Sequence, residues 1–383
     1  MNRSERPIRV LIIDDSAMFR RFLAQGIKSD PEFELVGAAA NAEQARQFIG
    51  IRRPDVISLD IEMPQMDGLT FLKEEISKDP IPTIIVSSQT SNGARATIEA
   101  LQAGAVDVLP KPKMVAGQDI AGITSQIRVS LKAARHAHVQ EEAVPAPSIS
   151  ARQRRTANQP SAPENLHSAN PQLNARWVFA IGASTGGVRA LGTVLAQLPK
   201  DAPATVVVQH MPAGFTNAFA RRLNDTCRVE VREAQHGDLL RQGLVLLAPG
   251  GETHMVVRPS PNGLCVVLNQ GDPVCYSRPS VDVLFASVAN YAAPRVSAAL
   301  LTGMGRDGAQ SLGMIRRVGG RTFAQDESSS VVWGMPAAAW ETGAAESLVP
   351  LNNVAGVMMS SIGISPPPLP EENIFSTPLR KGN

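Results

Sequence analysis

The N-terminal third of the chain alternates short apolar runs with amphipathic stretches. The apolar runs have the length and the content of β-branched residues that are typical of buried strands, and the stretches between them show helical spacing. Strands are predicted at Ile8–Ile13, Phe33–Ala38, Val56–Leu59, Thr83–Val86 and Val106–Leu109, and helices near 17–28, 42–51, 69–78, 92–103 and 117–135. Five such repeats predict a doubly wound parallel sheet of the flavodoxin-like kind.

The C-terminal half repeats this pattern and adds a hairpin. Two apolar runs, Met255–Arg258 and Leu264–Leu268, are separated by Pro-Asn-Gly and read as antiparallel strands. Further strands are predicted at Val178–Ile181, Thr205–Gln209, Val229–Arg232, Leu244–Leu247, Val296–Leu301 and Arg321–Ala324. We therefore expect an α/β protein with two doubly wound, mainly parallel-sheet domains, the second of them Rossmann-like with a β-hairpin.

A segment of different composition separates the two halves. Residues 136–175 contain five prolines, no glycine and no aromatic residue. Such a stretch buries too little apolar surface to offset its ordering entropy, so a flexible linker is predicted. A proline-rich tail is predicted to be disordered in the same way. The expected division is a first domain at 1–135, a linker at 136–175, a second domain at 176–363 and a tail at 364–383.

Composition narrows the class of protein. The 383 residues carry 37 basic and 35 acidic side chains, and this balance argues against a general nucleic-acid binder. No apolar run approaches 18 residues, the N-terminus lacks the apolar core of a secretory signal, and the three cysteines form no disulfide framework. A cytoplasmic protein is the expectation. In residues 176–383, 15 of 17 basic residues are arginine, which suits either an acidic protein substrate or a dispersed surface.

Acidic and polar residues gather at the predicted strand ends of the first half. Asp14 and Asp15 follow the first strand, Asp60 ends the third, Ser87 ends the fourth and Lys111 follows the fifth. The carboxyl ends of parallel strands meet at one edge of a sheet, so these side chains should converge. Three carboxylates with one lysine suit Mg²⁺ and the acceptance of a phosphoryl group.

These residues stand in motifs that resemble the response-regulator receiver family. The matching segments are Ile13-Asp-Asp-Ser-Ala17, Leu59-Asp-Ile-Glu-Met-Pro64, Met66-Asp-Gly68, Val86-Ser-Ser88 and Lys111-Pro112. The resemblance implies that Asp60 is the phosphoacceptor, that Asp14, Asp15 and Asp60 hold Mg²⁺, and that Ser87 and Lys111 are switch residues. One departure is Val108, where receivers often carry an aromatic switch residue.

A serine between glycines opens the second half. The strand at Val178–Ile181 runs into Gly182-Ala-Ser-Thr-Gly-Gly187, and a helical pattern follows at Val188–Leu198. A sharp strand-to-helix turn exposes a nucleophile to backbone N–H groups and a helix dipole. A phosphate-binding loop is disfavoured because no Gly-Lys-Ser/Thr follows. A plain capped turn is the other alternative, and a nucleophile at Ser184 requires a base and an orienting acid.

Histidine is scarce enough to narrow the choice of base. Of six histidines, three lie in the predicted linker, which leaves His210, His236 and His254. His210 ends an apolar strand and should share the sheet edge of Ser184, whereas the other two lie in a loop-like stretch and at the hairpin. Asp307 follows another strand and is either the orienting acid or a helix N-cap. The chain order Ser, His, Asp excludes an α/β-hydrolase, which runs Ser, acid, His.

The combination resembles the CheB family of chemotaxis protein-glutamate methylesterases. The matching segments are Ile181-Gly-Ala-Ser-Thr-Gly-Gly187, Val208-Gln-His-Met-Pro212, Ala248-Pro-Gly-Gly251, Arg278-Pro-Ser-Val-Asp282, Leu301-Thr-Gly-Met-Gly305 with Asp307-Gly308, and Ala324-Gln-Asp-Glu327 through Gly334-Met-Pro336. The resemblance implies Ser184 as nucleophile, His210 as base, Asp307 as its orienter, and Thr185 and Met304 beside the oxyanion pocket. Tyr276-Ser277 departs from the family, which often has histidine before Arg-Pro-Ser.

The expected function is a phosphorylation-activated serine hydrolase that removes methyl esters from glutamates of methyl-accepting chemotaxis receptors and also deamidates receptor glutamines. Phosphorylation of Asp60 is expected to relieve inhibition of the catalytic site by the receiver. The expected partners are those receptors and a chemotaxis-type histidine kinase, with Mg²⁺ in the receiver and no cofactor for the ester step. Nucleic-acid partners and membrane insertion are not expected. Three alternatives stay open: a glutamine deamidase on the same receptors, a DNA-binding response regulator, and a binding module with an inactive site.

Overall fold

A computed structural model gives the fold. It describes residues 6–64, 66–76, 78–88, 90–112, 120–135, 137 and 176–363. The predicted linker at 136–175 and the predicted tail at 364–383 lie outside the described residues, apart from Ala137, so the division into domains at these boundaries stays a prediction. Within the described residues no helix is both long enough and apolar enough to cross a membrane.

The first half forms a five-stranded parallel sheet in the order β2-β1-β3-β4-β5. Strands β1, β3 and β4 are almost completely buried, because helices cover both faces of the sheet. The strands are β1 (Ile8–Ile13), β2 (Phe33–Ala39), β3 (Val56–Asp60), β4 (Thr83–Ser87) and β5 (Asp107–Pro110), and the helices are α1 (Ala17–Lys28), α2 (Ala42–Ile51), α3 (Gly68–Phe71), α4 (Ser91–Gln102) and α5 (Ile120–Arg135).

Two of the differences from the sequence-based prediction concern α3 and β5. The helix expected over 69–78 is a short α3 that continues as one π-helical turn, η1 (Leu72–Ile76), because hydrogen-bond spacing cannot be read from periodicity. The fifth strand begins one residue later than expected, at Asp107, so the carbonyl of Val106 lies outside the strand. The Val106 carbonyl instead accepts a hydrogen bond from the Gly186 N–H of the second half.

The second half forms a seven-stranded parallel sheet in the order β14-β13-β12-β6-β7-β9-β8. The chain begins in the middle, at β6, moves out through β7 to one edge and then returns to β12 on the other side of β6. The strands are β6 (Val178–Ala183), β7 (Ala204–Gln209), β8 (Glu230–Glu233), β9 (Leu244–Leu247), β12 (Val296–Leu300), β13 (Arg321–Gln325) and β14 (Ser347–Val349). This reversal at β6 creates a switch point, where open α/β sheets place their sites.

Helices cover both faces of this sheet, and a separate hairpin lies beside it. The hairpin pairs β10 (His254–Ser260) with β11 (Gly263–Asn269), as the Pro-Asn-Gly pattern predicted. The helices are α7 (Gly187–Gln197), α8 (Phe215–Thr226), α9 (Val281–Tyr291), α10 (Ala309–Arg317), α11 (Met335–Glu341) and α12 (Val354–Ser360), with a 3₁₀ turn η2 (Leu351–Asn353). The α/β class with two mainly parallel sheets is therefore confirmed.

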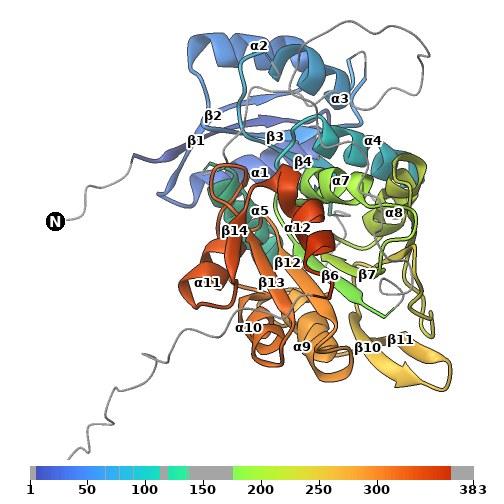
Figure 1. The fold of residues 1–383 in the computed structure, drawn as a ribbon. Coiled ribbons are helices and arrows are strands. Elements are labelled where there is room, and N and C mark those ends of the chain that lie inside the picture. Colours follow the sequence, from blue (N-terminus) through green and yellow to red (C-terminus); the bar gives the residue numbers. More distant parts are fainter. Residues whose placement is uncertain are drawn as a thin grey trace, which may run out of the picture.

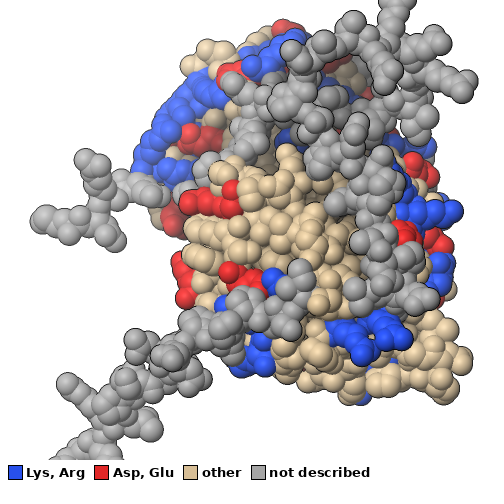
Figure 2. Space-filling view, in the orientation of Figure 1, with Lys and Arg blue, Asp and Glu red and all other residues tan. Residues whose placement is uncertain are grey.

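The two halves pack against each other directly. Helix α4 of the first half lies along α7 and α8 of the second, as Figure 1 shows. One continuous apolar core includes buried residues of both halves, and Arg222 on α8 donates a hydrogen bond of 3.2 Å to Gln102 on α4. The face in Figure 2 carries basic and acidic side chains around its margin and mainly other residues at its centre. Charge on this face is thus dispersed.

Candidate functional site

The predicted acidic residues of the first half converge at the carboxyl edge of its sheet. Asp14 follows β1 and Asp60 ends β3, and both are about 2% exposed or less. The ammonium of Lys111 lies 2.5 Å from Oδ2 of Asp60 and 2.8 Å from Oδ2 of Asp14. Asp15 is exposed, but one of its carboxylate oxygens joins those of Asp14 and Asp60 within a span of 4.8 Å. The fold therefore brings the three aspartates and Lys111 together, as the sequence predicted.

This donor set fits a hard divalent cation. All three ligand atoms are carboxylate oxygens, which Mg²⁺ prefers, and the exposed side of Asp15 leaves room for the waters that Mg²⁺ retains. Burial raises the pKa of Asp60 to about 6, and the neighbouring Asp14 carboxylate adds to this effect while Lys111 opposes it. A bound cation would relieve the repulsion between the carboxylates. The residues therefore fit Mg²⁺.

Ser87 and Val108 are the other two positions that the receiver resemblance connects with switching. The Ser87 side chain is fully buried, and its hydroxyl lies 3.4 Å from the backbone carbonyl of Ser88. Val108 is 4% exposed and belongs to the apolar core. A buried valine cannot swing between an inward and an outward position as an aromatic side chain can.

In the second half, Ser184 lies at the centre of the sheet's carboxyl edge. It follows β6, and its backbone N–H donates to the carbonyl of Thr302, which follows β12. The Gln209 amide ties the turn to the next strand, because its Nε2 donates to the carbonyls of Ser184 at 2.8 Å and His210 at 2.9 Å. A side chain at Gly187 would meet the Gln209 amide, with a Cβ only 2.0 Å from Oε1. The glycine is therefore needed for this close approach.

His210 and Asp307 form a close pair beside this turn. His210 follows β7, the strand next to β6, and its Nε2 lies 2.7 Å from Oδ2 of Asp307. The carboxylate accepts three more hydrogen bonds, from the hydroxyl of Ser280 and the backbone N–H groups of Val281 and Asp282. With a carboxylate as acceptor, Nε2 of His210 carries the proton, and Nδ1 of the neutral ring keeps its lone pair.

The Asp307 carboxylate caps a helix, but not the helix that follows it in the sequence. The N-cap of α10 is Gly308, in a left-handed conformation, whereas Asp307 binds the first N–H groups of α9. Asp307 is therefore not the N-cap of the helix that follows it in the sequence. Burial alone would raise the pKa of Asp307, but the His210 hydrogen bond and the N–H groups of α9 outweigh it and lower the pKa below its ordinary value.

The other two candidate bases are engaged elsewhere. His254 is 3% exposed, with Nε2 at 3.0 Å from the carbonyl of Asp272 and Nδ1 accepting from the Ser280 N–H, so it supports the start of α9. His236 is exposed in a loop, with Nδ1 3.4 Å from the carbonyl of Leu268. His210 is thus the histidine that the fold places beside both Asp307 and the Ser184 turn.

The departure from the family motif lies directly at His210. The Ser277 hydroxyl is 3.4 Å from Nδ1 of His210, the ring nitrogen that faces away from Asp307. Ser277 closes a tight turn with Val274, and the two central residues, Cys275 and Tyr276, have positive φ. Tyr276 is completely exposed at the tip of this turn. The turn therefore holds a hydroxyl on the candidate base and an aromatic ring in solvent.

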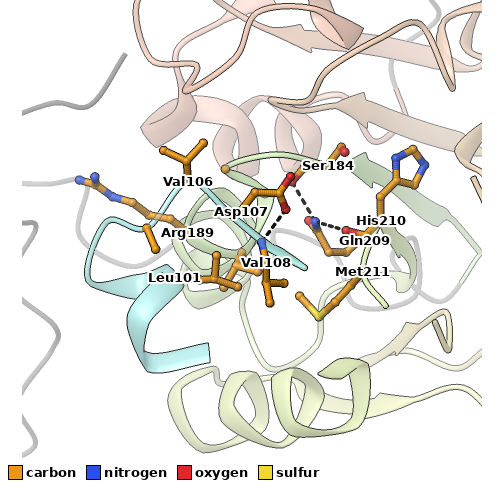
Figure 3. Close-up of a pocket in the computed structure, with 13 residues that line it drawn as sticks. Leu101, Val106, Asp107, Val108, Ser184, Arg189, Gln209, His210 and Met211 are labelled. Carbon is orange, nitrogen blue, oxygen red and sulfur yellow. Dashed lines mark hydrogen bonds between the residues drawn. The ribbon is translucent and has the colours of Figure 1, made fainter. Parts of the chain in front are cut away.

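Residues of the first half fill the space in front of Ser184. The Gly186 N–H donates to the Val106 carbonyl at 3.1 Å, and the hydroxyl of the buried Thr185 donates to Oδ2 of Asp107 at 3.2 Å. Asp107 shares one small pocket with Ser184 and His210, as Figure 3 shows, and the free volume there is about 10 Å³. That volume holds about one water molecule. Met304, also predicted beside this site, is 43% exposed.

Sequence reasoning missed three residues that the fold brings to this site. Asp107 lay inside a predicted strand, Gln209 ended another, and Ser280 stood in the Arg278-Pro-Ser motif without an assigned role. A signal existed for Ser280, since a serine that precedes a helical pattern is a common N-cap. None existed for Asp107, because contacts between domains leave no periodic trace in the sequence.

Comparisons with known proteins match both halves of the chain. The family model for CheB methylesterase matches residues 179–358, and that for the response regulator receiver domain matches residues 10–117. The chain is 50% identical over 354 residues to the protein-glutamate methylesterase/protein-glutamine glutaminase of group 2 operon from Cereibacter sphaeroides, covering 92% of this chain and 91% of that protein. It is 45% identical over 353 residues to protein-glutamate methylesterase/protein-glutamine glutaminase 2 from Pseudomonas aeruginosa, covering 92% and 96%.

Solved structures match each half separately. The catalytic domain of Thermotoga maritima CheB methylesterase is 34% identical, with a TM-score of 0.47, and the match covers 48% of this chain and 97% of that one. The response regulator domain of Thermotoga maritima CheB is 39% identical, with a TM-score of 0.31, covering 34% and 97%.

Proposed function

The chain belongs to the CheB methylesterase family, and we propose that it hydrolyses the methyl esters of glutamate side chains on methyl-accepting chemotaxis receptors. The observation that carries this proposal is the His210–Asp307 pair at 2.7 Å beside the Ser184 turn, beyond the carboxyl ends of three adjacent strands. A serine, a histidine and a buried carboxylate at one sheet edge are the parts of a covalent acyl-transfer site.

In this mechanism the Ser184 hydroxyl attacks the ester carbonyl, and its proton passes to Nδ1 of His210. Asp307 keeps the proton on Nε2 and stabilises the positive ring that forms. Backbone N–H groups at the start of α7 hold the developing oxyanion. The proton then moves from His210 to the leaving oxygen, and methanol departs from an acyl-enzyme. Water, deprotonated by His210, releases the glutamate carboxylate and restores Ser184.

The same groups support hydrolysis of a side-chain amide. An amide carbonyl is attacked in the same way, and His210 protonates the leaving nitrogen, so that ammonia replaces methanol. The related proteins from Cereibacter sphaeroides and Pseudomonas aeruginosa are named for both activities. Deamidation of receptor glutamines is therefore the second activity that we propose.

We propose further that phosphorylation of Asp60 by a chemotaxis-type histidine kinase activates the enzyme. Asp14, Asp15 and Asp60 would hold Mg²⁺, which supplies charge neutralisation for the incoming phosphoryl oxygens. Lys111 neutralises the remaining charge, and Ser87 binds a phosphoryl oxygen. The contacts of Val106 and Asp107 with the Ser184 turn support a closed, inhibited arrangement that phosphorylation opens. The enzyme would meet both the receptors and the histidine kinase in the cytoplasm.

One assay tests both halves of this proposal. Methanol release from methylated receptor membranes is measured for the full chain with and without a small phosphodonor and Mg²⁺. We expect strong activation in the wild type, none in Asp60→Asn, and no release at all from Ser184→Ala. Methanol release that survives in Ser184→Ala would overturn the esterase assignment, and activation that survives in Asp60→Asn would overturn the regulatory one.

A further inference from the structure

The receiver places a carboxyl group in the candidate active site. Asp107 is the first residue of β5, and its Oδ2 accepts a hydrogen bond of 3.2 Å from the hydroxyl of Thr185, the residue next to the nucleophile. In Figure 3 its carboxylate lies toward Ser184, in a pocket that Leu101 and Val106 also line. The contact thus reaches the turn that must bind the substrate's reacting group.

This carboxyl group is not explained by an ion pair. Among the described residues its hydrogen-bond partners are its own neighbour, the Val108 N–H at 2.8 Å, and the Thr185 hydroxyl. No lysine or arginine of the described ranges pairs with it, and burial raises its pKa to about 6 although the nearby His210 ring opposes the shift. A carboxyl group buried in an interface with only a hydroxyl and a backbone N–H as hydrogen-bond partners is costly for packing alone. Its position therefore calls for a functional explanation.

The product of the proposed reaction carries the same chemical group. Hydrolysis of a glutamate methyl ester, or of a glutamine amide, leaves a side-chain carboxylate beside Ser184. We propose that Thr185 and the Gly186 end of α7 form the subsite for this carboxyl group of the receptor, and that Asp107 fills the subsite as a product mimic in the closed form. This inference rests on the proposed esterase function and adds which group of the substrate Thr185 recognises.

The weakness of the contact suits this role. One hydroxyl-to-carboxylate bond and one backbone bond, Gly186 N–H to the Val106 carbonyl, join the receiver to the nucleophile turn. A mimic with a cationic partner would be held too firmly for a receptor side chain to replace it. When the receiver moves, the Thr185 hydroxyl becomes free for the receptor's own carbonyl or carboxylate.

The first experiment compares two substitutions that each remove one hydrogen bond between the halves. Asp107→Ala empties the subsite, whereas Arg222→Ala removes the bond to Gln102 at α4, away from Ser184. Without phosphodonor, methanol release by the full-length Asp107→Ala variant should rise at least fivefold, and that of Arg222→Ala less than twofold. Equal rises would show that loosening the interface is sufficient and would overturn the inference.

The second measurement identifies the subsite by its ligand. Sodium propionate at up to about 100 mM, against sodium chloride at the same concentration, should inhibit Asp107→Ala severalfold, because the free carboxylate occupies the empty place. Propionamide should inhibit much less, and unphosphorylated Arg222→Ala should not respond. Inhibition that is the same in both variants would contradict occupation of the subsite by Asp107.

A third measurement does not depend on the folding of the Asp107 variant. In the phosphodonor-activated wild type, propionate should compete with the ester substrate, and Thr185→Val should raise its inhibition constant at least fivefold. An unchanged inhibition constant would remove Thr185 from the subsite. These outcomes are separate from the esterase assignment, which stands or falls with methanol release by Ser184→Ala.

Discussion

Asp60 and Asp307 occupy equivalent places in the two sheets, yet their surroundings differ in kind. Each carboxylate lies at the carboxyl edge of a parallel sheet and is 2% exposed. Asp307 accepts four hydrogen bonds and its pKa is lowered, whereas Asp60 lies against Asp14 with Lys111 as counter-charge and its pKa is raised to about 6. The hydrogen bonds of Asp307 all come from the second half of the chain, whereas Asp60 lies beside a second carboxylate that only Lys111 offsets.

The largest effect on methanol release should come from a substitution of Asp307. Asp307→Asn keeps the shape but cannot accept all four hydrogen bonds, and it permits the wrong tautomer of His210. We expect kcat for methanol release by the phosphodonor-activated chain to fall by about 10³–10⁴-fold. Asp225→Asn, on the exposed surface of α8, serves as the control and should be unchanged. A loss below tenfold would mean that Asp307 does not orient the base.

A smaller effect should follow from removing Lys111, the counter-charge of the Asp14 and Asp60 carboxylates. Lys111→Ala leaves the Asp14 and Asp60 carboxylates facing each other without their ammonium group. We expect the activation of methanol release by phosphodonor and Mg²⁺ to fall by about tenfold or more. Lys28→Ala, exposed at the end of α1, is the matched control. Full activation of the Lys111 variant would place the switch elsewhere.

Stability should depend on pH with opposite signs at the two carboxylates. Because the pKa of Asp60 is raised, its contribution favours folding below pH 4 and is lost as the pH rises to about 6. Asp60→Asn should therefore stabilise the chain by about 1–3 kcal/mol at pH 8 without Mg²⁺, and by little at pH 4. Millimolar Mg²⁺ should narrow the difference at pH 8.

For Asp307 the sign is reversed. Its pKa is lowered, so its contribution is present above pH 4 and is lost as the pH falls through the lowered value. Asp307→Asn should thus destabilise the chain at pH 8 and have less effect near pH 3. Denaturant unfolding across this range measures both variants. Shifts of the same sign in the two variants would show that the sites do not differ as described.

The smallest effect is expected at Ser277. Its hydroxyl is 3.4 Å from Nδ1 of His210, a long contact that Ser184 must replace during attack. Ser277→Ala should change kcat/KM for the ester by less than about threefold. A change above tenfold would assign Ser277 a part in positioning the base, and the catalytic site would then be less complete than Asp307 suggests.

The sequence was most informative where the chain is periodic. Helices α1 and α2 match their predicted bounds, and most strands lie within two residues of the prediction, because buried parallel strands are continuous apolar runs. The three-residue strand β14 was missed because so short a run gives no pattern. The π-helical turn η1 was missed because the spacing of its side chains resembles that of an α-helix.

Residues of the candidate sites could be placed from the sequence where they follow a predicted strand. Placing Ser184, His210 and Asp307 at one edge required only the parallel sheet and the motifs. The partners of Asp307 at the start of α9 required the tertiary structure, since residues 280–282 follow no strand that predicts their position. Contacts between the halves, such as Thr185 with Asp107, depend on how the two folded halves pack together, which the sequence pattern does not indicate.

One short strand, β5, reaches both chemical centres. Asp107 begins it in the candidate esterase pocket, and Lys111, directly after its end, binds Asp60. Four residues of extended backbone span about 13 Å, so the strand holds the Asp60 site and the Ser184 pocket at a fixed separation. Side chains on a strand alternate, and an even spacing puts both residues on one face. Inserting a single residue between them would turn one of the two side chains away from its own site, and the strand would then no longer join the two centres.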